Sequence, residues 1–100
     1  MVPRIPVEVP AEQTEALARR LRVLGDVTRL QMLDLLTQQD VPLCVCDITN
    51  VFPLHQPTIS HHLRLLREEG LIASEKRGVW SYYRATDEGA RVLALVRDVL

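Results

Sequence analysis

The sequence predicts a mainly α-helical fold that carries one small β-hairpin. Apolar residues recur every three or four positions in several segments, which is the spacing of one helix face, and glycine or proline separates these segments. In the last third of the chain, a segment rich in aromatic residues follows a short basic turn that contains glycine, as in a two-stranded hairpin. Helices followed by a basic hairpin in this order predict a winged helix-turn-helix.

The chain has 100 residues and is expected to hold a single domain. Three prolines fall within residues 1–10, so this stretch is expected to be an extended N-terminal arm, and residues 11–100 are expected to form the domain. A domain of this size buries only roughly 60–70% of its unfolded surface. Additional core is therefore expected from a second subunit.

Two longer helices are expected in the first part of the domain. The first covers residues 11–24 and ends at Gly25, and the second begins at Val27, where Asp26 can cap the free backbone amides. The apolar positions of the two helices are Leu17, Leu21, Leu24, Val27, Leu30, Leu33 and Leu36.

A short helix and a longer helix are expected next, as in a helix-turn-helix. Pro42 and Pro53 limit the short helix to residues 46–51. The longer helix is expected to begin at Pro57, because the fixed backbone dihedral of proline suits the first helical position, and to end before Gly70.

The longer helix has one apolar and one polar face. On a helical wheel that starts at Ile59, Leu63 and Leu66 lie within about 40° of Ile59, and the opposite face carries Ser60, His61, Arg64 and Glu68. The apolar face is expected to pack against the domain and the polar face to be free for DNA.

The hairpin and a last helix complete the expected domain. Residues 71–75 and 79–85 are expected to be strands, because Trp80 and two tyrosines favour the second strand and Gly78 supplies a turn residue. Thr86 or Asp87 can cap the last helix. Its apolar positions cover a wider arc than one small core can use, which predicts a dimer seam, and they are Val92, Leu93, Val96, Val99 and Leu100.

Charge and hydropathy narrow the functional classes. The net charge is −1, so a DNA-binding surface has to be local, and residues 64–84 do carry five basic residues against three acidic ones. No apolar run approaches the roughly 20 residues that span a bilayer, and residues 1–6 lack the core of a signal peptide, so a cytoplasmic protein without membrane association is expected. We expect no enzyme, because there is no nucleophile–base–acid set and no glycine loop for phosphate.

Cys44 and Cys46 are separated by one residue and lie just before the helix-turn-helix. In a reducing cytosol such a pair is more consistent with metal or redox chemistry than with a structural disulfide. Residues i and i+2 lie about 200° apart around a helix, so both sulfurs are expected to reach one ion only if the helix start unwinds or reorients. Ligand binding would then distort the helix that precedes the recognition helix.

The sequence resembles the ArsR/SmtB family of metal-responsive repressors along nearly all of its length. The matching segments are Leu24–Leu30, Leu43–Ile48, Gln56–Leu63, Gly70–Ile72 and Lys76–Arg84. The resemblance implies a homodimer that represses a resistance operon by binding an inverted repeat of operator DNA and leaves it when a metal or metalloid binds. It also implies a dimer formed by the first and last helices, through Leu17, Leu21, Leu93, Val96 and Leu100.

Within that family, the segment around Cys44 and Cys46 resembles the arsenite and antimonite site of arsenical-resistance repressors. The resemblance implies As(III) or Sb(III) as the inducer and no organic cofactor, and sulfur is the ligand that such soft ions prefer. Where that pattern often has a third cysteine, this chain has Thr49, and the N-terminal cysteines of cadmium-type relatives are absent. Two thiolates with water, hydroxide or a small thiol as third ligand favour arsenite over cadmium or lead.

The residues expected to contact DNA are Gln56, Thr58, Ser60, His61, Arg64 and Arg67 on the recognition helix and Lys76 and Arg77 on the hairpin. Three alternative interpretations stay open. The first is a repressor of the same fold that responds to Cd(II) or Pb(II), and the second is a repressor of the same fold whose cysteines act as a thiol redox switch. The third alternative is a winged helix that serves only as a protein-interaction module.

Overall fold

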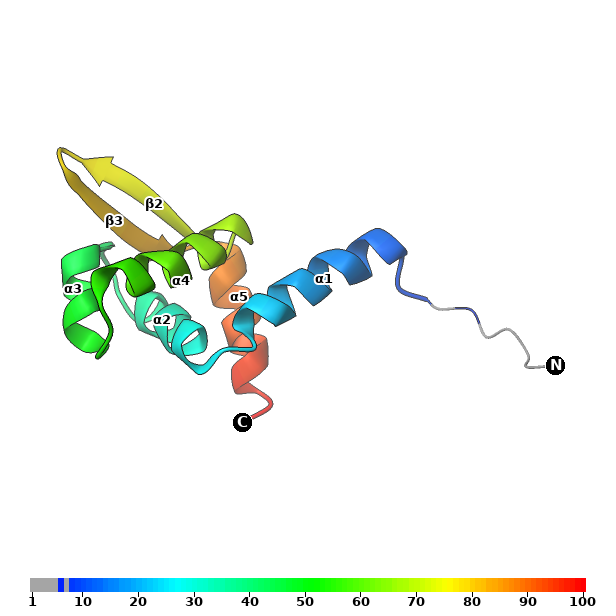
Figure 1. Ribbon diagram of the computed structural model, residues 1–100. Helices are drawn as coiled ribbons and strands as arrows, with labels where there is room; N and C mark the ends of the chain where they lie inside the picture. Colours follow the sequence, from blue (N-terminus) through cyan, green and yellow to red (C-terminus); the bar gives the residue numbers. More distant parts are fainter. Residues whose placement is uncertain (1–5, 7) are drawn as a thin grey trace.

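The computed structural model describes Pro6 and residues 8–100 (Figure 1). Most of the predicted N-terminal arm at residues 1–10 therefore lies outside the described residues, and the division of the chain into arm and domain stays a prediction. The elements of the described part are α1 (Ala11–Leu24), α2 (Val27–Thr37), β1 (Leu43–Cys44), α3 (Val45–Val51), α4 (Gln56–Glu68), β2 (Ile72–Arg77), β3 (Trp80–Ala85) and α5 (Asp87–Arg97).

Helix α1 extends away from the rest of the protein, whereas α2 lies at the centre of the helical part (Figure 1). Leu24, the last residue of α1, is that helix's buried residue, while Leu17 and Leu21 are about half exposed. The carboxylate of Asp26 accepts a hydrogen bond of 3.0 Å from the backbone amide of Arg29, which confirms the predicted cap of α2. Most of the apolar surface of α1 is therefore uncovered in a single subunit.

Helices α3 and α4 form the predicted helix-turn-helix. Ile59, Leu63 and Leu66 of α4 are fully buried, as the helical wheel predicted. His55 precedes α4 with extended backbone angles, so the helix begins at Gln56, one residue before the predicted start. Pro57 is therefore the second helical residue and not the first. The shift is tolerated because the amide of the second helical residue also lacks a partner within the helix.

The three strands form an antiparallel sheet in the order β1-β3-β2. The hairpin of β2 and β3 confirms the predicted wing, and Gly78 has the positive φ of 64° that its turn requires. The two-residue strand β1 was not predicted: Leu43 pairs with Tyr83 and Cys44 with Tyr82. The wing is thereby joined to the segment that leads into α3.

One buried cluster connects the helices to the base of the wing. Its members are Leu24, Met32, Leu33, Leu36, Ile48, Ile59, Leu63, Leu66, Leu71, Ile72, Tyr83 and Leu93. Thr86 caps the start of helix α5, because its hydroxyl accepts a hydrogen bond from the Gly89 amide. The helices and the wing together form a winged helix-turn-helix fold, which confirms the predicted fold class.

Candidate functional site

Cys44 occupies the N-cap position of α3, immediately before the helix. Its sulfur accepts a hydrogen bond of 3.2 Å from the backbone amide of Asp47, and the Asp47 carboxylate accepts one of 3.1 Å from the Cys44 amide. This reciprocal pair is a capping box in which a cysteine takes the place that serine or threonine usually holds. Cys44 is 6% exposed, so its sulfur is held in a nearly buried position at the helix N-terminus.

Cys46 is the second residue of α3 and is exposed. The Cα atoms of Cys44 and Cys46 are 5.2 Å apart, and the two sulfurs lie at bonding distance, as in a disulfide. The prediction that the helix start has to unwind before both sulfurs meet is wrong, because Cys44 has extended backbone angles (φ −73°, ψ 161°) and lies outside the helix. The helical angle between residues i and i+2 does not apply to this pair.

The two sulfurs and the carboxylate of Asp47 form a compact set of donor atoms. One ligand atom from each of the three residues lies within 4.8 Å of the others. The Asp47 amide that donates to the Cys44 sulfur and the positive end of the α3 dipole both face this sulfur. The arrangement suits a soft, thiophilic ion, and the Asp47 carboxylate is at the same time engaged in the capping box.

Thr49 stands where a third cysteine occurs in the arsenite-type pattern. Its hydroxyl donates a hydrogen bond of 2.7 Å to the carbonyl oxygen of Val45, within the helix. This bond satisfies the hydroxyl locally, and hydroxyl oxygen is a poor ligand for a soft ion. Thr49 therefore does not replace the missing thiolate.

The residues predicted to contact DNA are all exposed. They lie on α4 and on β2 of the wing, and they are Gln56, Thr58, Ser60, His61, Arg64, Arg67, Lys76 and Arg77. His61 Nδ1 and Arg64 Nη2 lie 3.0 Å apart, and Pro57, Ser60, His61 and Arg64 line a shallow hollow on α4. A guanidinium at this place has the geometry to bind a phosphate or the edge of a guanine.

Arg67 has a second role that the sequence did not indicate. Its guanidinium donates a hydrogen bond of 3.2 Å to the hydroxyl of Ser74 on β2. The bond connects the last turn of α4 with the wing across Gly70, whose φ is 71°. Arg67 therefore contributes to the contact between α4 and the wing.

His62 is turned away from the exposed face of α4 and contacts the junction of α1 and α2. Arg29 lies between them: its Nε donates to the carbonyl oxygen of Val23 at 2.5 Å, and its Nη1 is 3.1 Å from His62 Nδ1. Because Arg29 can only donate, His62 accepts at Nδ1 and carries its proton on Nε2. Burial, together with the nearby charges of Arg29 and His61, lowers the pKa of His62 below 6.5, although Asp26 acts in the opposite direction. His62 thus serves the fold as a neutral acceptor.

Residues predicted for a dimer seam are distributed over α1, α5 and the C-terminus. Leu17 and Leu21 are 52% and 55% exposed, Leu100 is 97% exposed, and Val96 is half-buried. Leu93 is only 5% exposed and belongs to the core of the subunit. The structure therefore contradicts the placement of Leu93 in a seam, since α5 turns this residue toward α2 rather than outward.

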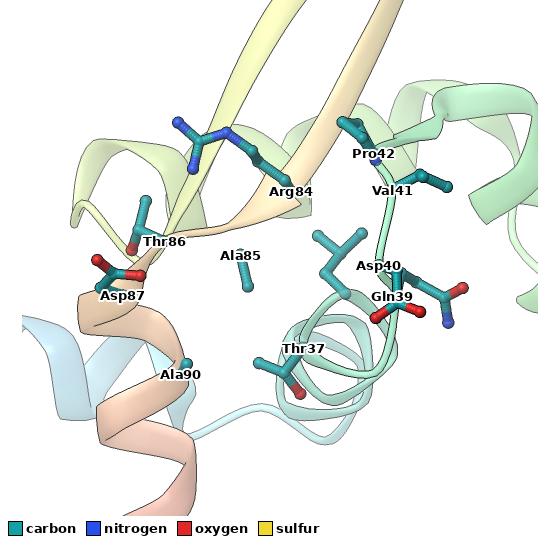
Figure 2. Close-up of a pocket in the computed structure, with 11 residues that line it drawn as sticks. Thr37, Gln39, Asp40, Val41, Pro42, Arg84, Ala85, Thr86, Asp87 and Ala90 are labelled. Carbon is teal, nitrogen blue, oxygen red and sulfur yellow. The ribbon is translucent and has the colours of Figure 1, made fainter.

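A hollow lies between the end of α2, the loop that leads to β1, the end of β3 and the start of α5 (Figure 2). It has a volume of about 230 Å³, and its charged lining residues are Asp40, Arg84 and Asp87. Neither cysteine lines it. The two cysteines at the start of α3 thus lie outside this hollow.

Among the residues that the structure describes, no helix is both long enough and apolar enough to cross a bilayer.

Comparison with known proteins assigns the chain to a family. Residues 26–74 match the family described as bacterial regulatory protein, arsR family. An HTH-type transcriptional regulator of Methanocaldococcus jannaschii is 36% identical over 89 residues, which cover 89% of this chain and 99% of that protein. The chain belongs to the arsR family of bacterial regulatory proteins. The resemblance found in the sequence is thereby confirmed.

Two further arsR relatives support the assignment. The arsenical resistance operon repressor of Bacillus subtilis is 36% identical over 81 residues, covering 81% of this chain and 76% of that protein. A solution structure from Mycobacterium bovis, described as a homodimeric winged helix-turn-helix DNA-binding domain of a possible ArsR-family regulator, has a TM-score of 0.81 and 31% identity. That similarity covers 96% of this chain and 88% of the other.

Proposed function

We propose that this arsR-family protein is a homodimeric transcriptional repressor that binds an inverted repeat in operator DNA and is released by As(III) or Sb(III) bound to Cys44 and Cys46. The observation that carries the proposal is the convergence of both sulfurs at the N-terminus of α3, the first helix of the helix-turn-helix. Sensor and recognition helix are thus consecutive elements of the chain.

The chemistry of the two cysteines fits a trivalent metalloid. Arsenous acid, As(OH)₃, condenses with two thiols to form two As–S bonds and two water molecules. One hydroxyl stays on arsenic, where water, hydroxide or a small thiol can exchange. The pair therefore meets the demand of arsenite without a third cysteine, whereas Cd(II) and Pb(II) prefer more thiolates than this chain supplies.

The capping box supplies a path from the ligand to the recognition helix. A sulfur that bonds arsenic has less electron density for the hydrogen bond from the Asp47 amide, and a lost N-cap costs about 1 kcal/mol. Ile48 of α3 and Ile59 of α4 belong to the same buried cluster, so a displaced α3 disturbs the seat of α4. A coupling of about 1.4 kcal/mol is enough for tenfold weaker DNA binding.

The DNA-binding surface and the dimer complete the proposal. The exposed face of α4 fits a major groove, and the wing carries Lys76 and Arg77 for phosphate contacts. Leu17 and Leu21 form an exposed apolar stripe on α1 that a second copy of the chain would cover. A dimer would present two copies of α4 to the two halves of an inverted repeat.

The proposal is tested by fluorescence anisotropy of a labelled duplex that carries an inverted repeat from the promoter upstream of the coding sequence. Reduced protein is added first, and arsenite, antimonite, cadmium and zinc are then added separately. Release by arsenite or antimonite alone, lost in Cys44→Ser and Cys46→Ser variants that still bind the duplex, is the expected result. Absence of salt-dependent binding would favour the protein-interaction module instead.

A thiol redox switch at the same site is a second candidate, because the two sulfurs lie at bonding distance. Formation of the disulfide removes two electrons and two protons from the thiol pair, and hydrogen peroxide accepts them and becomes two water molecules. Release of DNA by peroxide with recovery after dithiothreitol, and no release by arsenite or antimonite, would select the redox switch over the metalloid sensor. Release by cadmium alone would select the Cd(II)-responsive alternative.

A further inference from the structure

We infer that Tyr82 is a positioning residue that holds Arg77 of the wing and links it to Cys44, so that a ligand on Cys44 alters the wing as well as α3. The inference rests on the proposed function, because it assumes that Cys44 binds the inducer and Arg77 contacts DNA. It adds a second path from the sensor to the DNA-binding surface.

The first step of the path is the pairing between β1 and β3. Cys44 lies directly opposite Tyr82, and Tyr82 lies directly opposite Glu75 of β2. Residues that face each other across antiparallel strands project to the same side of the sheet, with Cβ atoms about 4.5–5.5 Å apart. Cys44, Tyr82 and Glu75 therefore form one row across the three strands.

The second step leads from Tyr82 to Arg77. The guanidinium carbon of Arg77 lies 4.8 Å from the centroid of the Tyr82 ring, which is a cation–π contact. Arg77 Nε is also 3.1 Å from the Glu75 carboxylate, so ring and carboxylate together hold one conformation of a side chain that is still 57% exposed. Arg77 Nε and Nη2 donate to the Glu75 carboxylate, which leaves the N–H groups of Nη1 for a phosphate, and a fixed side chain loses less entropy when it binds.

The position of Cys44 makes this row sensitive to a ligand. Cys44 is 6% exposed, so atoms added to its sulfur require neighbouring atoms to move. On the other side of the sheet, Tyr83 is buried and pairs with Leu43, which fixes that side against the core. Strand β1 has only two residues and few ladder hydrogen bonds, so it is the strand that yields most easily. Movement is therefore directed to the row that contains Tyr82.

The test compares DNA affinities of the reduced wild type with those of Tyr82→Leu, Tyr82→Phe, Arg77→Ala and the double variant Tyr82→Leu/Arg77→Ala. Tyr82→Leu is expected to weaken DNA binding about two- to fivefold, the range of an exposed cation–π contact. Tyr82→Phe keeps the ring and is expected to bind as the wild type does. In the Arg77→Ala background, Tyr82→Leu is expected to have no further effect, whereas a general loss of wing stability would weaken binding by the same factor in both backgrounds. Equal factors would overturn the positioning role.

A second measurement needs no DNA and no substitution in the wing. The side-chain Nε–H signal of Arg77 is followed by NMR in the reduced protein, before and after addition of arsenite. A ring-current shift in the free protein that changes with arsenite, and does not change in Cys44→Ser, is the expected result. A thiol assay shows whether arsenite is bound. If arsenite is bound and the Arg77 signal does not change, the link to Cys44 is overturned. Failure of DNA binding in the wild type would refute the proposed function instead, and the NMR result would still decide the link.

Discussion

The capping role of Cys44 can be separated from its role as a ligand by two substitutions at the same position. Serine is a better N-cap than cysteine, and its hydroxyl can accept the same hydrogen bond from the Asp47 amide, so Cys44→Ser is expected to keep α3 intact. Alanine cannot accept this bond. Both substitutions remove one of the two sulfurs, and both are expected to abolish release by arsenite.

The magnitude follows from the capping box. Cys44→Ala loses the bond to the Asp47 amide but keeps the bond from its own backbone amide to the Asp47 carboxylate, so only half of the box is lost. Loss of an N-cap costs about 1 kcal/mol, and the small gap left by a sulfur that is 6% exposed raises the total to about 1–2 kcal/mol. For a domain of this size each kcal/mol lowers the midpoint of thermal unfolding by about 4–8 °C.

The assay is urea and thermal unfolding followed by circular dichroism, with dithiothreitol present and at one protein concentration. Reductant removes the contribution of any disulfide from the wild type, and a fixed concentration removes the effect of association on the midpoint. Cys44→Ser is expected to lie within about 0.5 kcal/mol of the reduced wild type. Cys46→Ser is the matched control, because Cys46 is exposed and does not cap the helix. Equal stability of Cys44→Ala and Cys44→Ser would refute the capping role.

Three further predictions concern the recognition helix and the dimer. Because the pKa of His62 is lowered in the folded protein, its contribution to stability is complete above pH 6.5 and falls as the pH decreases toward the folded pKa. Between pH 7.5 and 5.5, the free energy of unfolding should therefore fall less in His62→Gln than in the wild type. His61→Gln is the control. Equal slopes for His62→Gln and wild type would contradict the assigned role. Arg64→Ala should weaken DNA binding about tenfold without changing arsenite uptake, and unchanged anisotropy curves would remove it from the contact surface. Leu17→Glu/Leu21→Glu should give monomers in light scattering, because the charges lie on exposed apolar surface, and a persistent dimer would place the seam elsewhere.

The helices of the domain could be predicted because each carries its own local pattern. Ile59, Leu63 and Leu66 recur at helical spacing and are fully buried in the structure, and Asp26 is followed by an apolar helix that it caps. The wing could be predicted from Gly78 and the aromatic residues that follow it. In each of these cases, the interactions that decide the structure lie within a few residues in the sequence.

Strand β1 and the position of Cys44 could not be predicted in the same way. Leu43 and Cys44 are too few for a strand pattern, and their partners Tyr83 and Tyr82 lie about forty positions later in the sequence. A local signal for the cap did exist, because Cys44 and Asp47 have the spacing of a capping box, but cysteine is not among the usual capping residues.

The helical wheel also separates His62 from its neighbour His61. His62 lies about 60° from Ile59, at the edge of the apolar face, whereas His61 lies about 160° away. Two neighbouring histidines therefore have different surroundings. What the wheel could not give was the partner, because Arg29 belongs to another helix and reaches His62 only in the folded protein.

The joint between the recognition helix and the wing is closed by the first turn of α5. Gly70 and Leu71 connect α4 to β2, and the hydroxyl of Thr86 donates a hydrogen bond to the Gly70 carbonyl. The backbone of Gly89 lies so close to Leu71 that a Cβ on Gly89 would be 2.0 Å from the Leu71 carbonyl oxygen. In the proposed dimer, the first turn of α5 would thus set the angle of each reading surface. One extra base pair between operator half-sites turns the second half-site by about 34° along the duplex. Because this angle is fixed, the dimer would tolerate changes of base within a half-site better than a change of spacing between the two half-sites.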